Sequence, residues 1–365
     1  MGKLAMKTRK SKKCLFAGLV ALVLMLASLP VVIPWACNPQ AQPNSIPETR
    51  GYAGEVPDAY GIWPTREFTP GEAKSRPSAG FIRSLYDFTS RLDGNRLDSC
   101  LVLYKGNLVH EEYHNGYDAD TPHFMASVTK SVVSALVGAA IQDGIIGGVE
   151  DRVLGYFPEA GSLPGWQEIK RDMTIEHLLT RTSGITSDAV EIWEGYWADD
   201  LRDAALYTFL IPQELSPGEK YQSENIGMCI LLGIIERASG QPLMDYAHEK
   251  LFGPLGMDSV QWDTTADGLP TGGFGISMTP HDMLRFGYLY LNYGRWEDAQ
   301  ILPAEYVART PPRSKKPKAY GYLFWNYSKL PFSGNYEASG SQGQHIVILP
   351  GRDMVIAITA TKKGA

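Results

Sequence analysis

Cysteine is scarce in this sequence of 365 residues, and the few cysteines present form no recognisable framework. There are four, and no two have the CxxC spacing that zinc sites and redox sites use. Cys100 opens a predicted strand and Cys229 lies in an apolar segment, so we expect both to be buried thiols rather than a disulfide. A cysteine-based metal or redox centre is excluded.

Basic residues are also scarce once the first 36 residues are set aside. Those residues contain six Lys and Arg and no acid, which leaves 28 basic and 40 acidic residues, a formal net charge of −12. Binding to nucleic acid requires clustered Lys and Arg that neutralise phosphates, so a body this acidic argues against a nucleic-acid partner. The 20% charged and 11% aromatic residues are typical of a globular protein and exclude extensive disorder.

The run from Cys14 to Ala36 is uncharged and mostly apolar, and it directly follows the basic residues. Its 23 residues are long enough to span a bilayer, and basic residues before such a run place the body outside the cytoplasm. The pattern predicts that residues 1–37 are a signal peptide or an N-terminal membrane anchor. The protein would then be exported, and either secreted or held at the membrane through this segment. A lipid on Cys37 is a third alternative.

After this segment, residues 38–80 are predicted to be a tether and irregular lead-in, and residues 81–365 one globular domain. Apolar residues at helical spacing predict helices at 81–92, 127–142, 174–180, 225–238, 243–252 and 279–292. Other patterns predict a β-hairpin over 99–117 and strands at 320–327, 344–349 and 354–359. Strands at both ends with helices between them predict an α/β (α+β) sandwich, with a helical subdomain inserted in the middle.

His110 and His114 bracket the sequence HEEYH, a literal match to the HExxH motif of zinc peptidases. That motif binds zinc on a helix, where residues four apart share a face. The predicted hairpin would instead place the two histidines about 13 Å apart along a strand, too far to share one ion. A zinc peptidase is therefore the weaker alternative, and no metal is expected.

Ser127 and Lys130 have the SxxK spacing at the start of an apolar predicted helix. Residues three apart on a helix share a face, so the amine can reach the hydroxyl. A partly buried lysine loses its charge more readily, and the neutral amine can take the proton of a serine nucleophile. The spacing is common by chance, but small and apolar residues fill the rest of this helix. That context favours a buried catalytic pair over two surface residues.

Six blocks of sequence, in a fixed order, carry a resemblance to a known family. The blocks are residues 124–146, 151–159, 173–185, 217–257, 272–296 and 339–359. With them the chain resembles the β-lactamase-related serine hydrolases, which include class C β-lactamases, DD-peptidases, esterases and 6-aminohexanoate-dimer hydrolases. The GSQGQ segment at 340–344 looks closest to the last of these branches.

The resemblance implies a β-lactamase/DD-peptidase-like fold, with an antiparallel sheet built from both termini and flanked by helices. It implies a serine hydrolase without a cofactor, in which Ser127 attacks an ester or amide bond and Lys130 is the base. The substrate would be a small molecule or a short peptide-like compound, and water would release the acyl group.

A second family motif, Tyr-x-Asn or Ser-x-Asn, relays a proton to the leaving group. A count without gaps places it on Ser223 and Asn225, whereas a shift of two residues gives the relay to Tyr221. We expect the Ser223 hydroxyl to lie within hydrogen-bonding reach of Lys130 or Ser127, and the Tyr221 ring to pack under the loop.

The third family motif, Lys-Thr-Gly or a variant, falls on Ala338-Ser339-Gly340. The cation that would meet a β-lactam carboxylate is therefore missing. Ser339, Gly340 and the backbone N–H of Ser341 remain to bind substrate, and the N–H groups of Ser341 and Ser127 could form an oxyanion hole. The missing cation keeps another alternative open, a catalytically silent protein of the same fold that binds peptidoglycan fragments.

Overall fold

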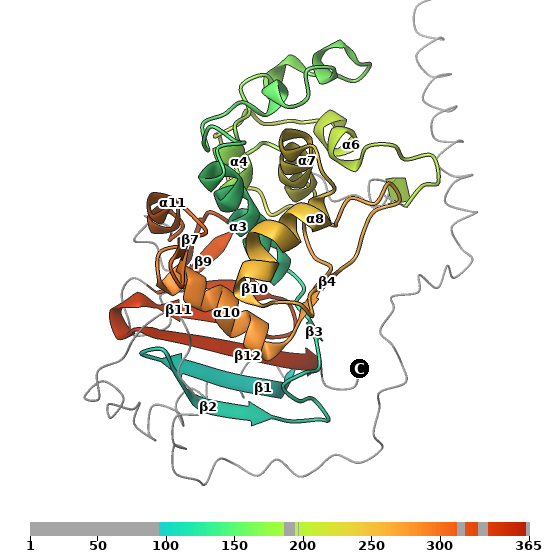
Figure 1. Ribbon diagram of the computed structural model, residues 1–365. Coiled ribbons are helices and arrows are strands. Elements are labelled where there is room, and N and C mark those ends of the chain that lie inside the picture. Colours follow the sequence, from blue (N-terminus) through green and yellow to red (C-terminus); the bar gives the residue numbers. More distant parts are fainter. Residues whose placement is uncertain (1–94, 186–193, 196, 312–317, 328–334, 363–365) are drawn as a thin grey trace, which may run out of the picture. The chain divides into compact units, whose positions relative to one another are not determined.

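The computed structural model describes residues 95–362, apart from 186–193, 196, 312–317 and 328–334 (Figure 1). All of them belong to one compact unit, Glu48–Ala365. The helix expected at 81–92 and the apolar run Cys14–Ala36 lie outside the described residues. Within the described ranges, no helix combines the length and the apolar character that a membrane span needs.

A seven-stranded antiparallel sheet forms one side of the described fold. Its strands are β1 (Asn95–Tyr104), β2 (Asn107–Tyr113), β8 (Lys318–Gly321), β9 (Phe324–Tyr327), β10 (Tyr336–Gly340), β11 (Gln344–Leu349) and β12 (Met354–Lys362). They lie in the order β2-β1-β12-β11-β10-β9-β8, with β12 paired to both β1 and β11. The sheet therefore joins strands from both ends of the domain, which confirms the expected architecture.

Helices separate the two groups of strands in sequence and supply the rest of the fold. They are α3 (Val128–Gln142), α4 (Ile175–Leu179), α6 (Ala204–Leu210), α7 (Gly227–Ser239), α8 (Leu243–Ala247), α9 (Gly253–Leu255), α10 (Pro280–Leu291) and α11 (Ala304–Arg309). Helix α10 lies across β11 and β12, and α3 contacts both β10 and α7 (Figure 1). Helix α3 thus connects the sheet to the helical region, and most of its residues are buried.

The two faces of the sheet belong to different apolar clusters because side chains alternate along each strand. On β1, Leu101 and Leu103 pack into the large cluster that includes α3, α7 and α10. Their neighbours Cys100 and Val102 pack into a smaller cluster on the other face. Cys100 and Cys229 are both buried and no disulfide joins them, as expected.

The strand predicted at 320–327 is wrong in one respect, because the segment forms two strands. The chain reverses at Tyr322 and Leu323, so that β8 and β9 form a hairpin in which Tyr320 pairs with Trp325. Leu323 has a φ of 59°, a turn conformation that its apolar side chain does not signal. Tyr322 and Leu323 are buried although they form the turn, so the sequence stays apolar through it and resembles a single strand.

Two small sheets were not predicted, because strands of two or three residues show no period. The first has the order β3 (His123–Phe124), β5 (Ile276–Met278) and β4 (Gln261–Trp262). The second pairs β6 (Arg295–Trp296) with β7 (Ala299–Gln300). The first matters for function, since β3 leads directly into the SxxK segment.

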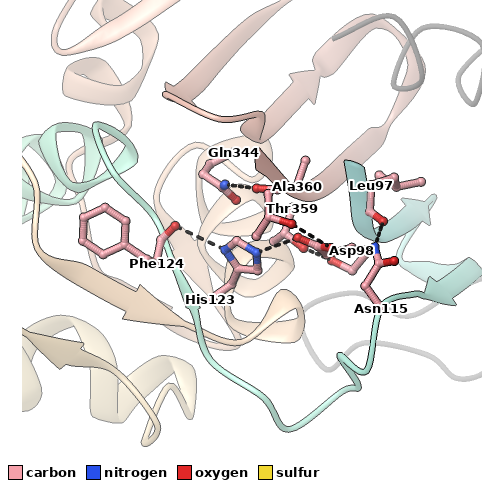
Figure 2. A network of polar contacts seen from close by, with 10 residues as sticks. Leu97, Asp98, Asn115, His123, Phe124, Gln344, Thr359 and Ala360 are labelled. Atoms are coloured by element: carbon pink, nitrogen blue, oxygen red, sulfur yellow. Dashed lines mark hydrogen bonds and ion pairs between the residues drawn. The ribbon is translucent and has the colours of Figure 1, made fainter. Parts of the chain in front are cut away.

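A buried polar network fastens β3 to the centre of the large sheet (Figure 2). The Asp98 carboxylate on β1 accepts hydrogen bonds from Asn115 Nδ2 at 2.8 Å and from Thr361 Oγ1 at 3.3 Å. Its second oxygen lies 3.0 Å from His123 Nε2. Asp98 is fully buried and His123 nearly so. The network joins residues from β1, β3 and β12.

Candidate active site

Ser127 lies directly before α3, at the end of the short connection from β3. The N–H of Met125 donates to the carbonyl of Ile276 on β5 at 2.8 Å, which holds this connection against the small sheet. Ala126 has a φ of 47°, an uncommon conformation for a residue with a side chain. The turn presents a half-buried Ser127 at the start of a buried helix. The first N–H groups of this helix, those of Val128, Thr129 and Lys130, donate to the carbonyl oxygens of Met125, Ala126 and Ser127.

Lys130 lies one turn further on, on the same face of α3. Its Nζ donates to Ser127 Oγ at 2.9 Å and to the carbonyl oxygen of Gly273 at 2.6 Å. The side chain is only 3% exposed, so the amine is held between these two partners away from bulk water. The shared face expected from the SxxK spacing is present.

The segment before α7 approaches Lys130 through Gly273. A Cβ on Gly273 would lie 2.6 Å from the carbonyl oxygen of Asn225 and 2.8 Å from its Cβ, so only glycine fits there. Gly273 therefore has Asn225 against its Cα, while its carbonyl accepts from Lys130. Tyr221 and Ser223 are exposed, whereas Glu224 between Ser223 and Asn225 is 1% exposed. Tyr221 and Ser223, the two residues expected to relay the proton, therefore lie on the solvent-exposed side of this segment.

The hydroxyls of Tyr221 and Ser223 meet a residue that the sequence did not identify, Arg181. Its Nη1 donates to the Tyr221 hydroxyl at 3.2 Å, and its Nη2 lies 3.4 Å from Ser223 Oγ. Among the described residues, the expected bond from Ser223 to Lys130 or Ser127 is not found, and the Ser223 hydroxyl faces Arg181 instead.

The Tyr221 ring packs against two aromatic rings from the β8–β9 hairpin. The centroids of Tyr320 and Trp325 lie 5.5 Å and 6.3 Å from that of Tyr221. The Arg181 guanidinium lies 5.4 Å from the Tyr221 centroid and 5.5 Å from that of Tyr320. Burial raises the pKa of Tyr221, while the positive charge of Arg181 opposes that rise.

Arg181 lies in the family-like block at residues 173–185, but no local pattern marked it as a site residue. It is 5% exposed and has a φ of 56°. Its carbonyl accepts from Gln222 N at 2.8 Å, so this strained residue is tied directly to the Tyr221–Ser223 segment. The contacts of Arg181 with Tyr221 and Ser223 join residues some 40 positions apart in the sequence. Helical or strand periodicity does not predict contacts over such a distance.

The end of β10 lies against the turn that carries Ser127. A Cβ on Gly340 would lie 2.4 Å from the carbonyl oxygen of Met125, so glycine permits this approach. Ala338 is fully buried in the large cluster, which places the next residue, Ser339, on the opposite face. There Ser339 Oγ lies 3.4 Å from His345 Nδ1, away from Ser127. Ser341 follows as an exposed residue of the β10–β11 turn.

The HEEYH segment lies on β2 and its end, as expected, and its histidines pair with a glutamate instead of facing each other. His110 Nε2 and His114 Nε2 lie 3.3 Å and 2.9 Å from opposite oxygens of Glu112. The strand spacing that argued against a shared zinc ion is present. In the described part of the chain, no group of three His, Cys, Asp or Glu side chains is placed to hold a metal ion.

Comparison with known proteins identifies the family of this chain. A family model described as Beta-lactamase matches residues 97–365. A 6-aminohexanoate-dimer hydrolase of Paenarthrobacter ureafaciens is 26% identical over 314 residues, which cover 79% of this chain and 78% of the relative.

Solved structures agree at the level of the fold. A putative 6-aminohexanoate-dimer hydrolase from Bacillus anthracis superimposes with a TM-score of 0.63 at 21% identity, covering 84% of each chain. A penicillin-binding protein homologue from Pyrococcus abyssi gives a TM-score of 0.60 at 20% identity, covering 79% of this chain and 74% of its own. Since the family model matches well over half of the sequence, the chain belongs to the Beta-lactamase family of serine hydrolases.

Proposed function

We propose that this protein hydrolyses an ester or amide through an acyl-enzyme on Ser127, with Lys130 as the base. One observation carries the proposal: a lysine that is 3% exposed has its amine 2.9 Å from the hydroxyl of a half-buried serine. A lysine placed in this way can exchange a proton with the serine without an intervening water.

In the proposed reaction, neutral Lys130 takes the proton of Ser127 as Oγ bonds to the substrate carbonyl carbon. The resulting oxyanion would accept hydrogen bonds from the N–H groups of Ser127 and Ser341, a type of contact worth roughly 10²–10³ in rate. The proton then passes to the leaving group through the hydroxyl of Tyr221 or Ser223 as the carbonyl–leaving-group bond breaks. Water attacks the acyl-enzyme, and its proton returns Ser127 to the hydroxyl form.

The substrate we propose is a small molecule or short peptide-like compound with an ester or amide bond. Ala338 provides no cation for the carboxylate of a β-lactam, which argues against antibiotic hydrolysis. The relative from Paenarthrobacter ureafaciens is named as acting on a 6-aminohexanoate dimer, so a linear amide is one substrate to test. A panel of a nitrophenyl ester, a cephalosporin, a D-Ala-D-Ala peptide and a linear aminohexanoate dimer separates these classes.

A silent binding protein is the second candidate, and the alanine at position 338 favours it mildly. The contact between Lys130 and Ser127 favours hydrolysis, because a binding protein has no need for a buried amine beside a hydroxyl. Peptidoglycan-fragment binding without turnover of any panel member would support the binding protein.

A fluorophosphonate probe tests the nucleophile directly. We expect one adduct on Ser127 by intact-mass spectrometry and peptide mapping, no adduct in Ser127→Ala, and normal labelling in Ser162→Ala, a change at an exposed serine. Lys130→Ala should retain the fold by circular dichroism and lose about 10²–10⁴-fold in kcat, the usual contribution of a general base. Unchanged labelling of Ser127→Ala would remove the proposal.

A further inference from the structure

The peptide group between Ala126 and Ser127 is held on one side and open on the other. The carbonyl oxygen of Ala126 accepts two hydrogen bonds, from Thr129 N at 3.2 Å and from Thr129 Oγ1 at 2.7 Å. Within the described ranges, the N–H of Ser127, on the other side of this peptide group, donates to no protein group. A trans peptide is planar, and its C=O and N–H point in opposite directions. The two bonds from Thr129 therefore fix the direction in which the Ser127 N–H points.

The Thr129 hydroxyl links this peptide group to β5. Thr129 is fully buried in the first turn of α3. A hydroxyl can donate one hydrogen bond and accept others, and Oγ1 does both: it donates to the Ala126 carbonyl and accepts from Ile276 N at 3.2 Å. The carbonyl oxygen of Ile276 accepts from Met125 N at 2.8 Å. One residue of β5 thus holds the turn before the nucleophile at two points, and one of them is the Thr129 side chain.

These contacts hold a backbone conformation that is unfavourable on its own. Ala126 has a φ of 47°, and a residue with a side chain keeps such a conformation only where its surroundings impose it. Gly340 on β10 supports the same turn from another side, since a Cβ there would lie 2.4 Å from the carbonyl oxygen of Met125. Thr129 is the residue whose side chain bonds directly to the strained Ala126, so its hydroxyl is the natural point at which to test the turn.

Lys130, the next residue of α3, directs its amine to other atoms. Its Nζ donates to Ser127 Oγ at 2.9 Å and to the carbonyl oxygen of Gly273 at 2.6 Å. Loss of the Thr129 hydroxyl would therefore leave both of these bonds in place. The two neighbours act on different parts of the nucleophile, because the amine of Lys130 contacts the Ser127 hydroxyl and Thr129 fixes the peptide group that carries the Ser127 N–H.

We propose that Thr129 is a positioning residue for catalysis, whose hydroxyl orients the Ala126–Ser127 peptide group so that the Ser127 N–H donates to the substrate oxyanion. In acylation, Ser127 Oγ bonds to the substrate carbonyl carbon, its proton passes to Lys130, and the π electrons of the carbonyl pass to its oxygen. The aligned N–H stabilises the negative charge formed there. The assignment rests on the proposed function, in which this N–H is one of two oxyanion donors, and Thr129 itself does not touch the substrate.

Substitution of Thr129 by valine tests the hydroxyl alone. T129V keeps the size and the branched shape of the side chain, and Thr129 N, a backbone group, can still donate to the Ala126 carbonyl. We therefore expect a weakened alignment, with kcat for a nitrophenyl ester about tenfold lower and KM nearly unchanged, since complete loss of an oxyanion donor costs roughly 10²–10³. T129S retains the hydroxyl and should keep kcat near the wild-type value.

A control separates this role from a contribution to stability. T129V leaves the buried Ile276 N–H without its partner and should unfold more readily, so kcat is counted per serine labelled by the fluorophosphonate. Thr310→Val is the matched control, because Thr310 is fully buried and its Oγ1 donates to the Tyr306 carbonyl at 3.2 Å. It should also lower stability to urea and leave kcat per labelled serine unchanged. T129C, with a weaker donor, replaces T129V if the valine variant does not fold, and its kcat should fall as well.

A trifluoromethyl ketone with the acyl group of the ester tests the oxyanion contact without turnover. It forms a hemiketal with the nucleophilic serine, and its affinity follows the stabilisation of the transition state. T129V should weaken its binding by the factor that it takes from kcat, whereas T129S and Thr310→Val should not. Unchanged kcat per labelled serine and unchanged ketone affinity in T129V, or an equal loss in T129S, would overturn the role of Thr129. Failure of wild-type Ser127 to react with the fluorophosphonate would instead overturn the proposed function, so the two failures are distinguishable.

Discussion

Lys170 is a second buried lysine, and its chemistry differs from that of Lys130. It is fully buried, and its Nζ donates to the carbonyl oxygens of Phe209 and Ile211 at 2.8 Å and 2.7 Å, at the C-terminal end of α6. Helix C-terminal carbonyls attract cations, which makes this a structural contact between two loops. Burial lowers the pKa of Lys170 to about 8.

This lowered pKa predicts a change in stability with pH. Between about pH 8 and 10.5 the unfolded chain binds more protons at Lys170 than the folded chain does, so stability rises with pH across that window. Relative to Lys170→Met, the wild type should gain about 2–3 kcal/mol in free energy of unfolding from pH 7 to pH 10.5. Urea unfolding at both values measures it. The exposed Lys220→Met should show a constant difference, and a constant difference for Lys170→Met would contradict the prediction.

At the residue scale, local chemistry was predictable from sequence and contact over distance was not. Ser127 and Lys130 are three residues apart on one helix, so their meeting follows from helix geometry. The hydroxyls of Tyr221 and Ser223 face Arg181, which lies some 40 residues earlier and has a positive φ. The residues flanking Arg181 in the sequence do not predict its positive φ.

At the element scale, the Asp98 network decides how firmly β3 is attached to the sheet. Replacing Asp98 with Asn removes a buried charge facing His123 and puts an amide where three neighbours need an acceptor. We expect a loss of about 3 kcal/mol in unfolding free energy, the usual cost of breaking a buried pair. Urea denaturation measures it, with Asp298→Asn, at an exposed and distant ion pair, as the control. Equal losses in the two variants would show that the network contributes nothing specific.

Long elements followed from the sequence, whereas short ones did not. The expected helix at 127–142 is α3 (Val128–Gln142), and the one at 279–292 is α10 (Pro280–Leu291), begun by Thr279 with a capping box. The strands β3 and β5, which hold the nucleophile turn, have two and three residues. Their existence depends on pairing with each other, so the positions of these strands could be known only from the fold.

At the scale of the whole molecule, we predict that the first 37 residues direct where the protein acts. We expect the uncharged run Cys14–Ala36 to direct export or membrane attachment, with the catalytic domain outside the cytoplasm. Cell fractionation of the full chain and of a chain that begins at Asn38 tests this expectation. The shortened chain should remain in the cytosol. Full-length protein that is soluble in the cytosol with residues 1–36 still attached would contradict the expectation.

The central place of β12 has a consequence for biosynthesis. This strand is the last of the sheet to be made, yet it lies between β1 and β11. Without β12, the inner edges of β1 and β11 have no partner strand in this sheet. Such edges invite pairing with other chains, and contacts this distant in sequence form slowly. We therefore expect the complete sheet to form only once the final strand is available to join the two groups of strands.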